Sequence, residues 1–127
     1  MAEIKLQRYE FDMRLDHIAL IISKEENLSF YEKLGFKELT RFERSYDKVV
    51  FMGGESVTLE IFIDSNHPER MASPEAKGLR HIAFEIDDLE GAMSMFPCEQ
   101  IRTDWFGRKF TFIKDPDGQV IEIKEKR

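Results

Sequence analysis

The chain contains two copies of a short phrase in which a histidine opens an apolar run. The phrases are Leu-Asp-His-Ile-Ala-Leu around His17 and Leu-Arg-His-Ile-Ala-Phe around His81. A glutamate follows each at nearly the same interval, Glu60 within Thr-Leu-Glu-Ile-Phe and Glu122 within Val-Ile-Glu-Ile-Lys. A duplicated unit with one imidazole and one carboxylate at matched places can present two of each to a single metal centre.

This ligand set predicts a divalent metal site whose metal is Zn, Ni, Co, Mn or Fe(II), with open positions for water or substrate. Such a metal acts as a Lewis acid on adjacent substrate oxygens, and one carboxylate can double as a base. We therefore predict His17, Glu60, His81 and Glu122 as metal ligands, with Glu122 and Glu60 also as the catalytic candidates. A single His or Glu in a strand is usually structural or solvated, so the prediction depends on the repeated pair.

Alternation along the strands predicts which way these side chains point. Residues two apart in a strand share a face, so Glu60 points away from its apolar neighbours Leu59 and Ile61, and Glu122 is flanked in the same way. The apolar neighbours must face a core beneath helices. The histidines and glutamates then occupy the face that helices do not cover.

The elements that position these residues occur twice in the order β-α-β-β-β. The first set is a strand, a helix and three strands at residues 13–23, 28–34, 36–44, 48–52 and 57–63. The second set repeats it at residues 79–86, 89–96, 98–103, 109–114 and 119–125. Capping boxes are predicted at both helices, from Ser23 with Glu26 and from Asp87 with Glu90.

The predicted fold class is α+β, with two βαβββ units forming a curved mixed sheet whose concave face binds metal and substrate. We expect a single domain over residues 1–127, with a first unit at 13–63, a linker at 64–78 and a second unit at 79–126. Polar composition and two prolines mark the linker. The weak alternation from Met1 to Asp12 predicts an edge strand or an arm.

Composition narrows the class of protein. Of the 127 residues, 42% are hydrophobic and 35% charged, which is enough for one packed core. No apolar run reaches bilayer length and the first residues are too charged for a secretory signal, so we expect a cytoplasmic protein without a membrane partner. A net charge of −6 argues against nucleic acid. Cys98 is the only cysteine, which excludes an intrachain disulfide, and we expect its thiol to be buried.

The quoted phrases resemble the vicinal oxygen chelate superfamily, together with Phe-Tyr-Glu-Lys-Leu-Gly-Phe at 30–36 and Asp-Pro-Asp-Gly at 115–118. This superfamily includes glyoxalase I, extradiol dioxygenases, methylmalonyl-CoA epimerase, and fosfomycin- and bleomycin-resistance proteins. The resemblance covers residues 13–126 and is closest to small bacterial glyoxalase I-like proteins. It implies paired βαβββ units with the metal in the concave sheet.

The resemblance also bears on the individual site residues. It places His17, Glu60, His81 and Glu122 on the four ligands of glyoxalase I. Extradiol dioxygenases and fosfomycin transferases typically use two His and one Glu, and the epimerase typically has Gln at the position of Glu60, so Glu60 favours the glyoxalase type. The helix phrase is one residue shorter than that of glyoxalase I, and no glutathione-carboxylate clamp is evident. The resemblance therefore implies the ligands more firmly than the substrate.

We expect a metal-dependent glyoxalase I-like lyase or isomerase acting on a small oxygen-bearing substrate, such as a thiol adduct of a 2-oxoaldehyde. The alternatives are an Fe(II) extradiol-type dioxygenase and a non-catalytic small-molecule-binding resistance protein. Similar proteins of this length place the first unit of one chain against the second unit of a partner, which implies a homodimer. Pairing of the two units within one chain is the alternative.

Several cationic and aromatic residues are candidates for lining the mouth of the site and holding an anionic substrate. Taken singly, each cation is more often a solvated charge at a strand end. The candidates are Arg44, Arg80, Arg102, Trp105, Arg108 and Lys109.

Overall fold

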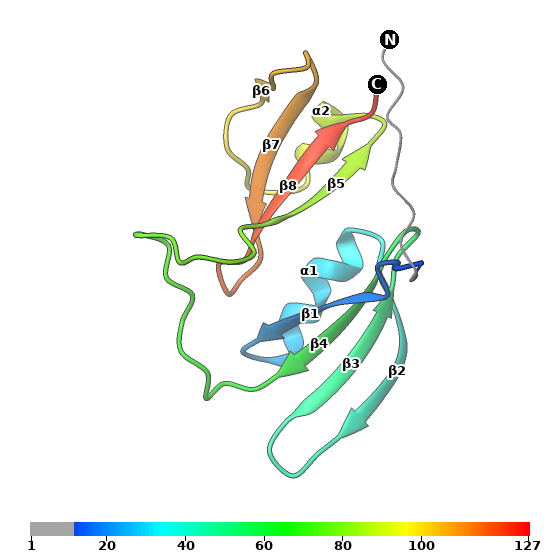
Figure 1. The fold of residues 1–127 in the computed structure, drawn as a ribbon, viewed down its shortest axis with the longest axis vertical. Helices are drawn as coiled ribbons and strands as arrows, with labels where there is room; N and C mark the ends of the chain where they lie inside the picture. Colours follow the sequence, from blue (N-terminus) through cyan, green and yellow to red (C-terminus); the bar gives the residue numbers. More distant parts are fainter. Residues whose placement is uncertain (1–11) are drawn as a thin grey trace.

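The computed structural model describes residues 12–127, which form two βαβββ units (Figure 1). The first unit contains β1 (His17–Ile22), η1 (Glu25–Asn27), α1 (Leu28–Lys33), β2 (Lys37–Glu43), β3 (Lys48–Gly53) and β4 (Thr58–Ile63). The second contains β5 (Ile82–Ile86), α2 (Leu89–Met93), β6 (Arg102–Thr103), β7 (Lys109–Lys114) and β8 (Val120–Glu125). The arm predicted at Met1 to Asp12 lies, apart from Asp12, outside the described residues. No helix within 12–127 is long and apolar enough to cross a membrane.

Each unit forms its own four-stranded mixed sheet, so the predicted α+β class is confirmed. The strand orders are β1-β4-β3-β2 and β5-β8-β7-β6. In each sheet the first and last strands of the unit pair in parallel, and the remaining pairs are antiparallel. The strand that carries the histidine phrase therefore lies directly beside the strand that carries the glutamate.

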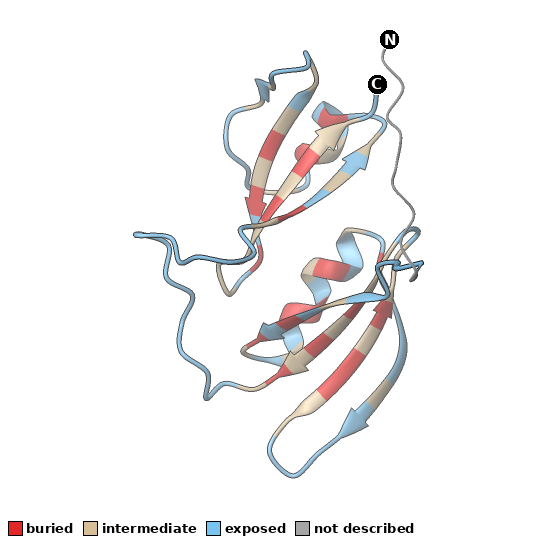
Figure 2. Ribbon diagram, in the orientation of Figure 1, coloured by how far each residue is buried: buried red, intermediate tan, exposed pale blue. Residues whose placement is uncertain are grey.

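The core is made by alternate residues of the central strands (Figure 2). In β4, Leu59 and Ile61 are fully buried, and in β8 Ile121 is fully buried. They pack with residues of the helices, including the fully buried Tyr31 and Leu89, in one continuous cluster that spans both units. Burial of these large apolar side chains on one face leaves the other face of each sheet to the histidines and glutamates.

A polar junction joins the first unit to the β7–β8 turn of the second. The buried hydroxyl of Tyr31 donates to Asp115 Oδ2 at 2.6 Å. Asp117 Oδ2 accepts from Asn27 Nδ2 at 2.9 Å and from the backbone N–H of Ser23 at 3.1 Å. Because the partners are far apart in the chain, these bonds fix how the start of α1 sits against the second unit.

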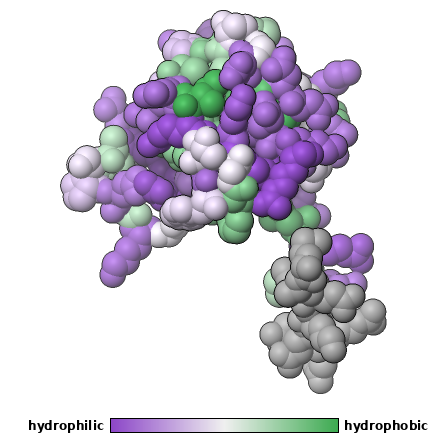
Figure 3. Space-filling model, turned by 90° about the horizontal axis from the view of Figure 1, so that it is seen from above, coloured by the Kyte–Doolittle hydropathy of each residue, from purple (hydrophilic) through white to green (hydrophobic). Residues whose placement is uncertain are grey.

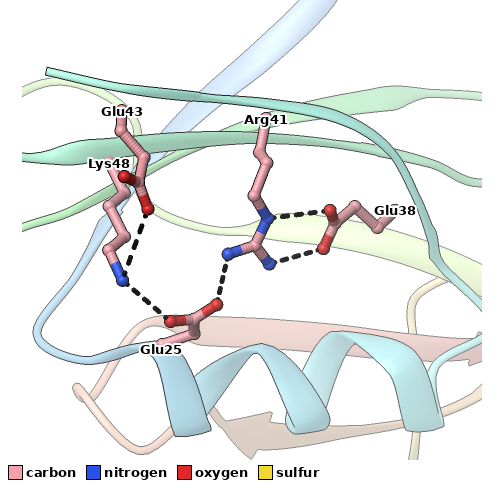
Figure 4. A network of polar contacts seen from close by, with 5 residues as sticks. All are labelled: Glu25, Glu38, Arg41, Glu43 and Lys48. Carbon is pink, nitrogen blue, oxygen red and sulfur yellow. Dashed lines mark hydrogen bonds and ion pairs between the residues drawn. The ribbon is translucent and has the colours of Figure 1, made fainter.

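A second polar network ties β2 and β3 to η1 (Figure 4). Arg41 donates two hydrogen bonds to Glu38, at 2.8 and 2.6 Å, and another to Glu25. Lys48 Nζ lies 3.1 Å from Glu25 and 3.9 Å from Glu43. Hydrogen bonds from Arg41 and Lys48 lower the pKa of Glu25, so both cations are neutralised by carboxylates here.

The capping box predicted at the first helix is wrong. No side chain caps η1 or α1. The hydroxyl of Ser23 instead accepts from Asn27 Nδ2 at 3.2 Å, and Glu26 caps nothing through its side chain. Ser23 and Asn27 are drawn into the junction with Asp117, a tertiary interaction that replaces local capping.

At the second helix the cap lies one residue later than predicted. Asp88, not Asp87, is the N-cap, and its Oδ1 accepts from the backbone N–H of Gly91 at 3.1 Å. The predicted partner Glu90 lies in the first turn of α2 and pairs with Lys109 at 3.2 Å.

The strand predicted over Cys98–Thr103 is much shorter, since β6 is only Arg102–Thr103. The carbonyl of Glu99 accepts a hydrogen bond from the side-chain hydroxyl of Thr111 at 2.7 Å. In a regular strand this carbonyl would accept from a backbone N–H of the neighbouring strand. Cys98 lies in the irregular segment before β6 and is exposed, which corrects the expectation of a buried thiol.

Candidate metal centre

The first histidine–glutamate pair lies on the helix-free face of the first sheet. His17 opens β1, and its Nε2 is 3.3 Å from Glu60 Oε1 on β4. The side chains are 39% and 22% exposed. Ala19 stands opposite Glu60 in the parallel register, and Phe51 stands opposite it in the antiparallel register. A small side chain therefore flanks Glu60 on one neighbouring strand and an aromatic ring on the other.

The second pair repeats this arrangement in the second sheet. His81 directly precedes β5, and its Nε2 is 3.0 Å from Glu122 Oε1 on β8. Ala83 and Phe112 stand opposite Glu122, as Ala19 and Phe51 stand opposite Glu60. This pair is more enclosed, with side chains 21% and 13% exposed.

The structure thus brings together His17 with Glu60 and His81 with Glu122, but it does not bring the two pairs together within one chain. Residues 12–127 contain no cluster of three or more His, Cys, Asp or Glu side chains able to hold a metal ion. Each pair offers one imidazole nitrogen and one carboxylate oxygen on the same side, which fits half of a four-ligand site for a borderline divalent metal.

A carboxylate orients the histidine of the first pair. Asp16 Oδ2 lies 2.7 Å from His17 Nδ1, and this hydrogen bond raises the pKa of His17, with a further contribution from Glu60. A proton held on Nδ1 leaves the Nε2 lone pair for a metal. The second histidine follows Arg80 instead, whose Nε pairs with Glu75 at 2.9 Å.

A lysine accompanies the glutamate of the second pair. Lys124 lies two residues beyond Glu122 on the same strand face, with its Nζ 3.5 Å from Glu122 Oε2 and 2.7 Å from Asp104 Oδ2. The contact with Lys124, together with hydrogen bonds from the backbone N–H groups of Arg108 and Phe106, lowers the pKa of Asp104 to about 2. In the first unit the position two residues beyond Glu60 is Phe62. Alternation alone would have found Lys124, which the sequence prediction missed.

The six residues predicted to line the mouth of the metal site lie in separate parts of the structure. Three of the cations are engaged by carboxylates in ion pairs: Arg44 with Asp47 at 2.6 Å, Arg108 with Glu85 at 2.9 Å and Lys109 with Glu90 at 3.2 Å. Trp105 is 98% exposed in the turn between β6 and β7. Arg80 and Arg102 line a pocket of about 270 Å³ together with His81. None of the four predicted ligands lines a cavity of about 900 Å³ that lies between the units beside Phe36 and Phe84.

Comparison with known proteins places this arrangement in a family. The sequence is 39% identical over 122 residues to YwkD of Bacillus subtilis, covering 87% of this chain and 95% of that protein. It is 38% identical over 124 residues to YaeR of Escherichia coli, covering 88% and 95%. The crystal structure of a glyoxalase family protein from Enterococcus faecalis superposes with a TM-score of 0.82 at 35% identity, covering 90% of this chain and 98% of that one.

More distant structures share the fold alone. They include glyoxalase I of Leishmania major, with a TM-score of 0.68 at 24% identity, and the fosfomycin resistance protein FosX of Listeria monocytogenes, with 0.69 at 16%. The alignments with them cover 90% and 92% of this chain, and 87% and 96% of theirs. The family model described as the Glyoxalase/Bleomycin resistance protein/Dioxygenase superfamily matches residues 14–123. Because the family model matches most of the sequence and both units, the chain belongs to this superfamily.

Proposed function

We propose that the protein is a metal-dependent glyoxalase I-like lyase or isomerase that acts on a small substrate with two adjacent oxygens, such as a thiol adduct of a 2-oxoaldehyde. The observation that carries this proposal is the pair of equivalent half-sites. Each has a histidine Nε2 within 3.3 Å of a glutamate Oε1, at the same register and on the helix-free face of its sheet. A small-molecule binder without a metal would have no need of four such donors.

The complete site is assembled in a homodimer, where His17 and Glu60 of one chain meet His81 and Glu122 of its partner. The helix-free face of the first sheet supports this arrangement, because Ile21 on β1 and Phe42 on β2 are exposed there. Exposed apolar side chains beside a polar pair mark a surface that another protein surface covers. A second copy is the partner that supplies the missing half of the ligand set.

A divalent metal bound by these four residues would polarise two neighbouring oxygens of the substrate and make the adjacent C–H acidic. Glu60 or Glu122 would then take the proton at a carboxylate oxygen and return it to the adjacent carbon. Phe51 and Phe112, opposite the two glutamates, would exclude water from one side of each carboxylate. Asp16 would keep the ring of His17 in the metal-binding tautomer.

Turnover of methylglyoxal with a panel of thiols tests this function, each thiol assayed with Zn, Ni, Co, Mn or Fe(II), once anaerobically and once in air with an oxygen electrode. We expect metal-dependent conversion of the thiol adduct without oxygen uptake. Glu60→Gln and Glu122→Gln should each reduce turnover by roughly 100-fold or more, in the range expected for a general base. Glu55→Gln, in the exposed turn before β4, is the matched control.

Unchanged turnover in both Glu60→Gln and Glu122→Gln would show that neither glutamate acts as the base, and would contradict the mechanism. Oxygen consumption stimulated by Fe(II) would show dioxygenase chemistry instead. Binding of small molecules with no metal and no turnover would show a resistance-type binder.

A further inference from the structure

A pocket of about 270 Å³ lies beside His81, between the linker and the second sheet. The linker contributes Arg70 and Glu75, and Lys114 closes the pocket at the end of β7. Phe112, which stands opposite Glu122 in the sheet, is part of the same wall. The pocket therefore adjoins the second half-site on the face where a substrate would lie.

Two cations of this pocket, Arg70 and Lys114, form no ion pair within 4.0 Å with a carboxylate of residues 12–127, although Glu75 lies close enough for the charge of Arg70 to lower its pKa. Arg70 donates to the carbonyl of Arg80 at 2.9 Å and to the side-chain oxygen of Gln119 at 3.4 Å, and both acceptors are neutral. By contrast, Arg41 and Lys48 in the network of Figure 4 are surrounded by carboxylates.

The other charges of the pocket nearly cancel. Arg80 pairs with Glu75 at 2.9 Å, and Arg102 lies 3.8 Å from Glu99. The pocket thus retains an excess of positive charge in a protein whose net charge is −6. Seen from the end formed by the second unit, the surface is mostly hydrophilic (Figure 3). A concave site with more cations than carboxylates favours an anion over a neutral ligand.

We propose that this pocket binds the carboxylate or phosphate group of a small molecule whose reactive oxygens reach the metal site. The guanidinium of Arg70 is held in place by its two neutral acceptors and presents its remaining N–H groups as a fork, while Lys114 supplies a point charge. The identity of this molecule as the substrate depends on the proposed function. Anion binding by the pocket does not depend on it.

The experiment is an amide ¹H–¹⁵N NMR titration of the metal-free protein with inorganic phosphate and, separately, with acetate. Potassium chloride at matched ionic strength is the reference. We expect saturable shifts concentrated at the amides of Ala72, Gly118 and Val120, which line the pocket. The anion that binds more tightly identifies the group that the pocket accepts.

The double variant Arg70→Gln/Lys114→Gln should weaken anion binding by about tenfold or more, because it removes two charged donors. Arg70→Lys should lose less, since it keeps the charge and loses the fork. Lys37→Gln, on exposed β2, is the control and should bind as the parent does.

Shifts scattered over the surface, or undiminished in the double variant, would overturn the proposal. Because the protein is metal-free, the result is independent of turnover. Localised anion binding without lyase activity would support the anion pocket and contradict the proposed enzymatic function. Lyase activity without localised anion binding would support the function and contradict the pocket.

Discussion

The two half-sites share their ligands but differ in every charged neighbour. Both have a histidine and a glutamate in contact, with Ala and Phe at matching registers. The first has Asp16 on its histidine, whereas the second has Lys124 beside its glutamate. Only the second adjoins the cationic pocket at Arg70. Both units keep the histidine–glutamate pair, and under the proposed function the divergence of their neighbours assigns substrate binding to the second unit.

The largest effect is expected on metal affinity when one of the predicted ligands is removed. The loss should be the same in both half-sites, although the second half-site is less exposed than the first. His17→Ala and His81→Ala should each lower metal affinity by more than the roughly 10- to 100-fold that loss of an outer-shell partner costs. Isothermal titration with Zn²⁺ measures this. His67→Ala, at the third histidine, is the control because His67 lies in the linker, 3.6 Å from Asp64. Loss of binding in only one of the two ligand variants would contradict a shared centre.

The β7–β8 turn of the second unit is joined to α1 of the first unit by a hydrogen bond from Tyr31 to Asp115. Tyr31→Phe leaves the buried Asp115 without the hydroxyl that donates to it, and should lower the free energy of unfolding by about 1–3 kcal/mol. Burial and the neighbouring Asp115 raise the pKa of Tyr31, so the hydroxyl stays neutral and remains a donor. Urea denaturation compares it with Tyr46→Phe at an exposed tyrosine. An equal decrease in the free energy of unfolding in the two variants would show that the junction contributes little to stability.

A smaller effect on metal affinity should distinguish Asp16 from Arg80, the residues that precede the two histidines. Asp16→Asn should weaken metal binding by roughly tenfold, the lower end for an outer-shell partner, because Asp16 is exposed. Arg80→Gln should leave metal affinity unchanged, because Arg80 pairs with Glu75 rather than with the histidine. Competition with a chromogenic chelator resolves the difference. An equal response of the two variants would remove the proposed asymmetry.

The smallest effect concerns the lysine that only the second half-site has. Lys124→Gln should return the pKa of Asp104 from about 2 towards its ordinary value of 3.8. Because the folded-state pKa is depressed, the stabilisation is present above the ordinary value and is lost as pH falls through about 2. Carboxyl ¹³C NMR follows the titration, with Lys109→Gln as the control. An unchanged pKa in Lys124→Gln would show that the contact is not formed.

The parts of this molecule that could be predicted from sequence are those set by local pattern. Alternation places Glu60 between buried Leu59 and Ile61, and that alone fixes the face on which the ligand candidate lies. Strand β7 was predicted at its observed bounds. The position of the second half-site followed from the repeat in the same way.

What could not be predicted depends on contacts between distant segments. The sequence predicts a local helix cap at Ser23, but its backbone N–H donates to Asp117 across the junction and its hydroxyl accepts from Asn27. The cationic pocket exists because Arg70, in a linker without periodicity, folds back onto the carbonyl of Arg80. No pattern within either segment indicates that return of the chain, so the sequence does not predict Arg70 and Lys114 as residues of the pocket.

In the proposed homodimer each of the two metal sites is shared by both chains, and mixing two variants that each lack one ligand tests this sharing most directly. His17→Ala and His81→Ala chains are combined, allowed to exchange subunits, and measured for bound metal by elemental analysis. Random pairing yields heterodimers with one intact site, so the mixture should regain about one quarter of the parent metal content. A mixture that binds no more metal than either variant alone would contradict the shared site.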